Sequence, residues 1–323
     1  MEFGLQLVGL EWPQLRDAAQ EAEGLGYRAL FVPDHLVAEG PERQVETDYL
    51  AYDPMIEVAV IAEATKTARI GHLVLCNLFR HPMITAQSLT SLDRLSGGRL
   101  LAGLGTGWTE REFTMSGIAF PEIGVRLQML DEALTCIRSL WTQEATTFHG
   151  EHYRLSEATL RPRPVQQPHP PIVLGGGGKG LLRLAAKHAA IVNIISEAGK
   201  PGYIKLANVA KLTDDSFKAK VRFVRDEARR YGRDPQSIRI STVIFSAILT
   251  ESPAATREMA ENMAPMFHTT PEGMLHSPLA LIGTPEQCIA ELQRRQREWE
   301  VSQVIFSRLA PKRRLAEEVL PHV

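Results

Sequence analysis

The chain has few of the features that mark exported, membrane-spanning and nucleic-acid-binding proteins. Its three cysteines, Cys76, Cys136 and Cys288, are odd in number and widely spaced, which fits reduced thiols better than a disulfide framework or a zinc knuckle. No stretch approaches the roughly 20 consecutive apolar residues of a membrane helix, and the N-terminal residues lack the basic region and cleavage site of a signal peptide. A net charge of −2 gives no general attraction for nucleic acid. We therefore expect a soluble, cytoplasmic protein whose partner is a small molecule, with no nucleic acid and no membrane bound.

Metal-binding signatures are missing as well. No His-x-His pair ends the first strand-like run, and no His-Glu-x-x-His motif occurs anywhere in the chain. His149 and His152 flank Gly150 in a predicted hairpin and do not share a helix face. We predict that the protein holds no metal.

Strand-like runs of aliphatic and β-branched residues instead alternate with helical patterns along the whole chain. There are eight such runs: 3–10, 29–33, 68–76, 99–105, 171–175, 190–196, 238–248 and 302–308. Nearly continuous apolar strands between amphipathic helices indicate a parallel sheet covered by helices. Eight units predict a single α/β domain over residues 1–323, folded as a (β/α)₈ TIM barrel with insertion segments. Residues 143–170 read as a small hairpin followed by an extended proline-rich crossing.

Several connections are too long to be simple turns. They cover residues 35–53, 106–123 and 196–237, with a further irregular region at 262–283. In TIM barrels the loops after the strands form the active-site face, so this length is placed where a ligand would bind. The last region carries Met263, Met266, Phe267 and Met274, which suggests an adaptable apolar pocket. After it, Thr284-Pro-Glu-Gln287 has the residues of a capping box and predicts a helix as far as Trp299.

The most unusual stretch is PIVLGGGGKGLLRLAAKH, from Pro171 to His188. Its glycines match G-x-G-x-x-G and Glu197 follows about 20 residues later, as in a dinucleotide-binding motif, although four βα units precede it. A Walker A loop is excluded because Gly180, not serine or threonine, follows Lys179. An ordinary strand-to-helix turn remains an alternative. Bare backbone amides, a helix N-terminus and Lys179 in one place favour a phosphate site over Gly175–Gly178.

Other candidate residues stand where predicted strands end. Asp34 and His35 end the second strand, and histidine suits proton transfer near neutral pH, although a buried structural pair would give the same pattern. Cys76 and Asn77 end the third strand, where a small core cysteine is the alternative. After the fourth strand, Trp108 is either an apolar plate at a pocket rim or a packed core residue.

Taken together, these motifs resemble the bacterial-luciferase-like superfamily of flavin and deazaflavin enzymes. The resemblance covers nearly the whole chain and is carried by FVPDHL, by RHP…LD.LSGGR…GLGTGW between Arg80 and Trp108, by PIVLGGGG and by LIGTPEQCIAEL. It implies a (β/α)₈ barrel, a homodimer formed through barrel helices, and a ribityl phosphate held by Gly175–Gly178.

The resemblance also implies roles for individual residues. Asp34 and His35 would lie beside the cofactor ring, with His35 donating a hydrogen bond or acting as general acid or base. Cys76 and Asn77 match a strained bulge, sometimes with a non-proline cis peptide, that backs the ring in relatives. Thr106 and Trp108 match positions that line the ring and pocket.

Two cofactors divide this superfamily, reduced FMN and the deazaflavin coenzyme F420. The Pro-Asp-His end of the second strand resembles the F420 branch more closely, which implies an oxidoreductase that transfers hydride between F420 and a small organic substrate. An FMN-dependent monooxygenase and a non-catalytic flavin-binding protein are the alternatives. With either cofactor, an enzyme of this kind would bind, orient and shield the ring while the cofactor supplies the chemistry.

Overall fold

A computed structural model describes residues 1–39, 45–46, 50–197 and 206–323. Parallel strands form a closed barrel in which β15 pairs with β1 and β7 pairs with β10, so that no barrel edge is left open. Its strands are β1 (Glu2–Gln6), β2 (Ala29–Val32), β5 (Arg69–His72) with its short continuation β6 (Leu75–Cys76), β7 (Leu100–Gly105), β10 (Ile172–Gly175), β11 (Ile191–Asn193), β12 (Arg239–Ile244) and β15 (Val301–Phe306). The eight predicted strands and the (β/α)₈ fold are confirmed.

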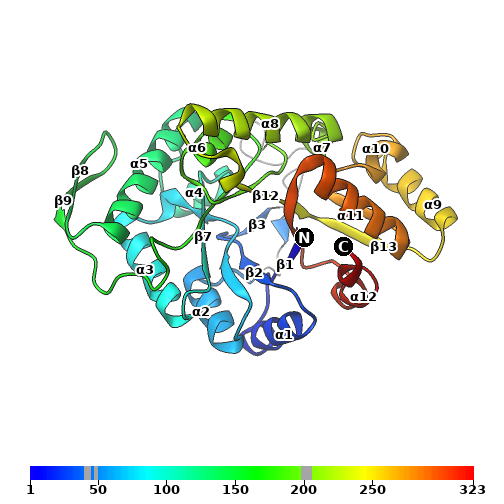
Figure 1. Cartoon of the computed structure of the whole chain (residues 1–323), viewed down its shortest axis with the longest axis horizontal. Coiled ribbons are helices and arrows are strands. Elements are labelled where there is room, and N and C mark those ends of the chain that lie inside the picture. Colours follow the sequence, from blue (N-terminus) through cyan, green and yellow to red (C-terminus); the bar gives the residue numbers. More distant parts are fainter. Residues whose placement is uncertain (40–44, 47–49, 198–205) are drawn as a thin grey trace.

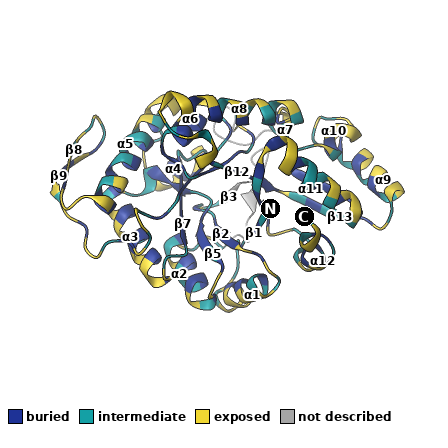
Figure 2. Cartoon of the chain, viewed as in Figure 1, coloured by how far each residue is buried: buried dark blue, intermediate teal, exposed yellow. Residues whose placement is uncertain are grey.

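Alternating side chains of the strands fill the inside of the barrel and the space beneath the helices. On β2, Phe31 points into the barrel interior with Leu101, Val173 and Ile305, whereas its neighbour Leu30 packs in the outer core. Figure 2 shows the same division in the helices, whose inner faces are buried and whose outer faces are exposed. Burying both faces of the sheet explains why the strands read as nearly continuous apolar runs.

Helices surround the barrel (Figure 1). They are α1 (Trp12–Gly24), α2 (Pro54–Ala64), α3 (Pro82–Leu95), α4 (Glu110–Ser116), α5 (Ile123–Thr142), α6 (Lys179–His188), α7 (Leu206–Val209), α8 (Asp214–Arg230), α9 (Pro253–Met263), α10 (Pro271–Leu275), α11 (Pro285–Trp299) and α12 (Lys312–Glu318). The helix predicted from the capping box is α11, and Thr284 and Gln287 cap it as expected. Within the described part of the chain, none of the helices is both long and apolar enough to cross a membrane.

Small sheets depart from the simple βα repeat. The predicted hairpin is β8 (Thr146–His149) paired with β9 (Arg154–Ala158), and β3 (Ala38–Glu39) pairs with β4 (Val45–Glu46) in the long second connection. Residues 40–44 and 47–49 of that connection, and 198–205 of the third, lie outside the described residues.

The predicted strand over 238–248 is two strands in the structure. It leaves the barrel after β12 and continues as β13 (Ser246–Leu249), which pairs in parallel with β14 (Ala280–Gly283). Residues 280–283 therefore form a strand, although the sequence was interpreted as irregular there. Together with α9 and α10, this strand pair builds a small separate core around Ala264, Met274 and Ile282. It lies at the opposite end of the molecule from the β8–β9 hairpin (Figure 1).

Candidate active site

One cavity of about 1570 Å³ opens where the barrel strands end. Residues at or just after the end of each of the eight strands contribute to its wall, from Gln6 and Val8 at β1 to Ser307 and Leu309 at β15. The additional segments line it too, because α4, α5, α8 and α10 each supply residues. The long connections thus gather at the carboxyl end of the barrel, as expected for a TIM-barrel ligand site.

Most of the residues singled out from the sequence line this cavity. They are Asp34, His35, Cys76, Thr106, Trp108, Gly175, Gly176, Gly177 and Gly178. Two others do not. Asn77 is buried and donates from Nδ2 to the hydroxyl of Tyr153 at 3.2 Å, and Lys179 is exposed as the first residue of α6.

His35 is held by a glutamate that the sequence interpretation did not include. Its Nδ1 lies 2.9 Å from Oε1 of Glu112, a carboxylate on α4 that is only 3% exposed. The same oxygen accepts the backbone N–H of Leu36 at 2.7 Å, and the edge of the imidazole meets Trp108 with ring centroids 5.5 Å apart. Because the glutamate engages Nδ1, the Nε2 side of the ring remains for a ligand in the cavity.

Asp34 is fixed more tightly than its neighbour. Its Oδ2 accepts from Arg80 at 2.6 Å and from the Cys76 backbone N–H at 2.9 Å, while Oδ1 accepts from Arg80 at 3.3 Å. Burial raises the pKa of the Asp34 carboxyl, and the Arg80 guanidinium opposes that rise. The contacts join the end of β2 to the end of β6, so they align two strands at the cavity floor.

The third strand is interrupted in the wall of the cavity. The Leu73–Val74 peptide bond is cis and separates β5 from β6, so the irregularity lies before Cys76 and Asn77, not between them. Burial raises the pKa of the Cys76 thiol to about 12, which keeps it protonated at neutral pH. The thiol is therefore a neutral part of the wall, not a nucleophile.

The packing of the glycine loop after β10 leaves no room for side chains at some of its positions. A Cβ at Gly177 would lie 2.1 Å from the carbonyl oxygen of Ile195, and one at Gly176, where φ is +153°, would lie 2.4 Å from Leu181. At Gly178, the residue before α6, a Cβ would meet nothing within 4 Å. The loop thus presents close-packed backbone at a helix N-terminus, the arrangement that binds anions.

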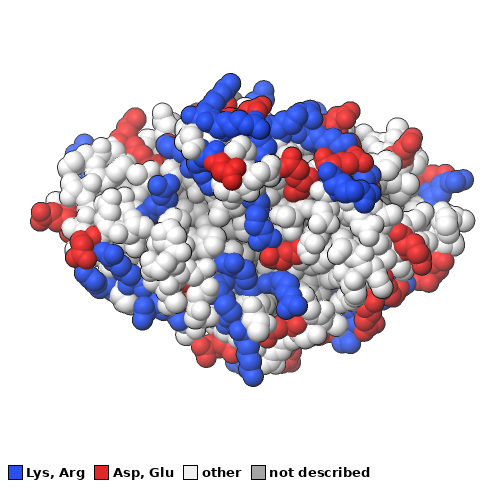
Figure 3. All heavy atoms as spheres, viewed as in Figure 1, with Lys and Arg blue, Asp and Glu red and all other residues white. Residues whose placement is uncertain are grey.

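Positive charge lies beside this loop. Lys220 on α8 donates to the Gly177 carbonyl and pairs with Glu197 at 2.9 Å. Figure 3 shows Lys and Arg side chains gathered along the edge that α6 and α8 form in Figure 1. Because Glu197 neutralises Lys220, an anionic group at the loop would depend on the backbone amides and the helix N-terminus for its stabilisation.

Arg126 on α5 is the second functional candidate that the sequence interpretation missed. It is buried in the cavity wall, donates to the Gly107 carbonyl, and stacks over Phe120 with 4.0 Å between Cζ and the ring centroid. Its Nε has no hydrogen-bond partner among the described residues. Burial lowers the pKa of the guanidinium, yet arginine stays charged in proteins. A buried cation with an unused donor points to an anionic or carbonyl ligand.

One of the two missed residues left a signal in the sequence. Arg126 stands four residues before Leu130, in phase with the apolar stripe that continues through Leu134 and Ile137, so it falls on the buried face of α5. A charged residue on an apolar face is a signal for a buried functional group. Glu112 left no such signal, because the residue next to it in the short helix α4, Phe113, does not share its face.

Comparison with known proteins assigns the chain to a protein family. A model described as luciferase-like monooxygenase matches residues 3–302, which is most of the chain. The chain belongs to the luciferase-like monooxygenase family. The resemblance based on Arg80 to Trp108 and on the glycine stretch is thereby confirmed.

Curated relatives support a particular branch of this family. The chain is 35% identical over 175 residues to an F420-dependent glucose-6-phosphate dehydrogenase of Kineococcus radiotolerans, a match that covers 54% of this chain and about half, 50%, of that relative. It is 27% identical over 289 residues to the enzyme of the same name from Amycolatopsis mediterranei, covering 86% of this chain and 84% of that one.

Solved structures share the fold. The coenzyme F420-dependent tetrahydromethanopterin reductase of Methanopyrus kandleri superposes with a TM-score of 0.75 at 20% identity, covering 99% of both chains. At that identity the likeness shows the luciferase-like barrel alone.

Proposed function

We propose that this chain is an oxidoreductase that uses coenzyme F420 to transfer a hydride to or from a small organic substrate. The names of the curated relatives support the cofactor and the reaction class. The observation that carries the proposal is that a bare glycine loop, a buried arginine and a glutamate-bound histidine line the same cavity.

The residues present fit a deazaflavin with a ribityl phosphate. In the Gly175–Gly178 loop before α6, the Gly176 N–H already donates to the Asn193 carbonyl at 3.0 Å, so the amides of Gly177 and Gly178 and the positive end of the helix dipole would hold the phosphate. In the same cavity wall, Arg126 has a guanidinium Nε with no acceptor among the described residues, and it can bond to an oxygen of the cofactor. When bound, F420 supplies the hydride chemistry, and the protein orients and shields it.

The polar residues at the opening of the cavity have separate roles in this proposal. Both carboxylate oxygens of Asp34 already accept hydrogen bonds, so we assign Asp34 to holding the ends of β2 and β6 in place. His35 moves the proton at the substrate oxygen through Nε2, because Glu112 engages Nδ1. Thr106 and Trp108 form the wall beside the cofactor, and Cys76 forms part of its floor.

The assembly and location belong to the same proposal. We propose a homodimer that uses α2 and α3, since α2 is mostly apolar and leaves Ile56 exposed, while Ile84 is exposed on α3, which packs against it. The three cysteines are unpaired, which supports the reducing cytoplasm expected from the sequence.

Equilibrium titration with F420 and with FMN tests the cofactor. We expect F420 to bind more tightly and to be reduced or oxidised without oxygen by a substrate of the enzyme, followed through the visible absorbance of its ring. Tighter binding of FMN together with oxygen-dependent turnover would overturn the proposal in favour of a monooxygenase.

A variant of His35 separates binding from chemistry. His35→Ala is expected to lower turnover about 100-fold, the order of magnitude for loss of a general acid or base, while F420 affinity changes little. His81→Ala is the matched control, because this exposed histidine caps α3 outside the cavity. Unchanged turnover in His35→Ala would instead indicate that the proton moves elsewhere.

A further inference from the structure

One side of the cavity differs in character from the glycine loop. The connections that follow β12 and β15 contribute a group of apolar side chains that we call the apolar sector. Its members are Phe245, Met266, Phe267, Met274, Leu279 and Leu309. In the barrel order, β12 and β15 lie two and three strands from β10, so this sector is separate from the anion-binding loop.

The apolar sector is exposed at its rim to an unusual degree. Phe245, Met266 and Leu309 are 44%, 63% and 77% exposed, although large hydrophobic residues that touch solvent are usually scattered singly. Here they share one cavity mouth with buried Met274 and Leu279. Exposed apolar side chains that continue into the lining of a cavity mark a binding surface for an apolar ligand.

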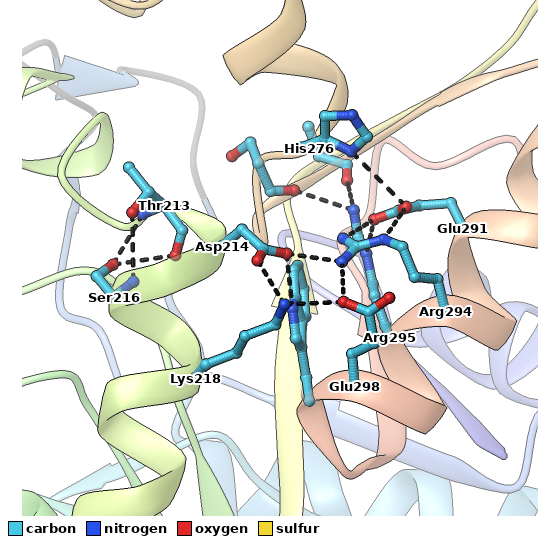
Figure 4. A network of polar contacts seen from close by, with 12 residues as sticks. Thr213, Asp214, Ser216, Lys218, His276, Glu291, Arg294, Arg295 and Glu298 are labelled. Carbon is cyan, nitrogen blue, oxygen red and sulfur yellow. Dashed lines mark hydrogen bonds and ion pairs between the residues drawn. The ribbon is translucent and has the colours of Figure 1, made fainter.

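The wall that carries this sector is held in place by buried ion pairs. Arg295 on α11 is fully buried and donates to the carbonyls of Ser277 and Ala280, at 3.0 and 2.6 Å, and to Glu291 at 2.7 Å. Arg294 extends the network to Asp214 on α8 at 2.7 Å (Figure 4). The apolar side chains are therefore presented by an anchored surface, which lowers the cost of ordering them around a ligand.

Charge in the same sector does not favour a phosphorylated substrate. Among the described residues that line the cavity between β12 and the end of the β15 loop, the charged ones are Glu272 and Arg308. With histidine neutral they leave no net positive charge, whereas recognition of a phosphate normally uses several cationic or amide donors. The relatives named as glucose-6-phosphate dehydrogenases thus do not predict the substrate of this chain.

We propose that the apolar sector binds the body of an uncharged, lipophilic carbonyl compound, such as a long-chain ketone or a conjugated enone. This inference rests on the proposed function, because it places the reacting carbon next to the deazaflavin. Hydride and one proton together reduce a C=O or C=C bond, and the reduced cofactor is oxidised by the same two electrons. A volume of about 1570 Å³ exceeds the 300–1,000 Å³ typical of one drug-sized ligand, so it can hold cofactor and substrate together.

Binding of Nile red, an uncharged apolar dye, tests the sector independently of turnover. We expect the full-length protein, with and without F420, to bind the dye, and 2-decanone but not glucose 6-phosphate to displace it. Met266→Asp and Leu309→Asp should each weaken dye binding about fivefold or more, because both remove apolar contact area and add a charge. Both side chains are mostly exposed, so folding should be retained and is checked by thermal unfolding.

Val165→Asp serves as the matched control, since Val165 is similarly exposed but lies outside the cavity lining. Displacement of the dye by glucose 6-phosphate, or equal dye affinity in all three variants, would overturn the inference. If the protein binds the dye but does not bind F420, the proposed F420-dependent function is rejected, whereas the apolar binding surface is still supported. F420-linked turnover of glucose 6-phosphate and not of 2-decanone would uphold that function and reject the apolar substrate.

Discussion

At the scale of single residues, the partners at the cavity floor come from distant parts of the chain. Asp34 and His35 could be placed at a strand end from the sequence, because an apolar run stops there. Arg80 lies 46 residues beyond Asp34 and Glu112 lies 77 beyond His35. Which charges meet depends on how the loops fold over the barrel mouth, and hydrophobic periodicity carries no information on that.

Glu57, a buried carboxyl on α2, gives a prediction at this scale. Burial, together with nearby Asp53 and Asp34, raises its pKa to about 7 from an ordinary 4.5. The folded state therefore binds more protons than the unfolded state between these values, so stability falls as the pH rises from about 4.5 to 7 and stays lower above it. Glu57→Gln should prevent this fall, and so raise the free energy of unfolding at pH 8 by about 3 kcal/mol.

Urea unfolding of both proteins across this pH range measures the effect. The variant should exceed the wild type in stability at pH 8 and match it near pH 4. Glu63→Gln is the control, because Glu63 is exposed on the same helix. Parallel stability curves for Glu57→Gln and the wild type would show that the carboxyl titrates normally.

At the scale of elements, the positions of strands and helices could be predicted from local sequence patterns. The division of one predicted strand into two could not. The run 238–248 is continuous in sequence, yet Phe245 takes the chain out of the barrel and the remainder pairs with β14. This change from the barrel to a second sheet can be recognised only from β14, the strand with which β13 pairs. The glycine stretch could be predicted as a strand, loop and helix, but the reason for its glycines lies in contacts with the loop after β11.

Those contacts give a prediction for the loop. Gly177→Ala must move either the loop or the backbone at Ile195, which a Cβ would approach to 2.1 Å. We expect F420 affinity to fall about tenfold or more, as for the loss of one or two charge-assisted backbone hydrogen bonds. Gly24→Ala is the control, because Gly24 ends α1 outside the cavity lining and a Cβ there has open space, so the F420 affinity of this variant should match that of the wild type. Isothermal titration measures both, and equal affinities would contradict a phosphate site that depends on the packed loop.

At the scale of the whole molecule, counting eight βα units was enough to predict the closed barrel, because closure leaves no unpaired edge. The count could not reveal how the inserted segments gather over one end and enlarge the cavity. Which part of the surface contacts another copy of the chain is a separate question, and α2 bears on it. Its sequence, PMIEVAVIAEA, is apolar except for Glu57 and Glu63, yet the helix lies at the surface of the single chain.

A homodimer through α2 and α3 would bury that face. Ile56 is 56% and Ile84 51% exposed, and the two helices pack beside one another. Replacing both with aspartate would bring unpaired carboxylates into a dimer interface, at a cost that well-packed apolar contacts cannot offset. We therefore expect sedimentation equilibrium to show a dimer for the wild type and a folded monomer for Ile56→Asp/Ile84→Asp. Tyr231→Asp, at an exposed position after α8, should remain dimeric. A dimer that survives the double substitution must use another surface, and a monomeric wild type would mean that the apolar face of α2 is left uncovered by self-association.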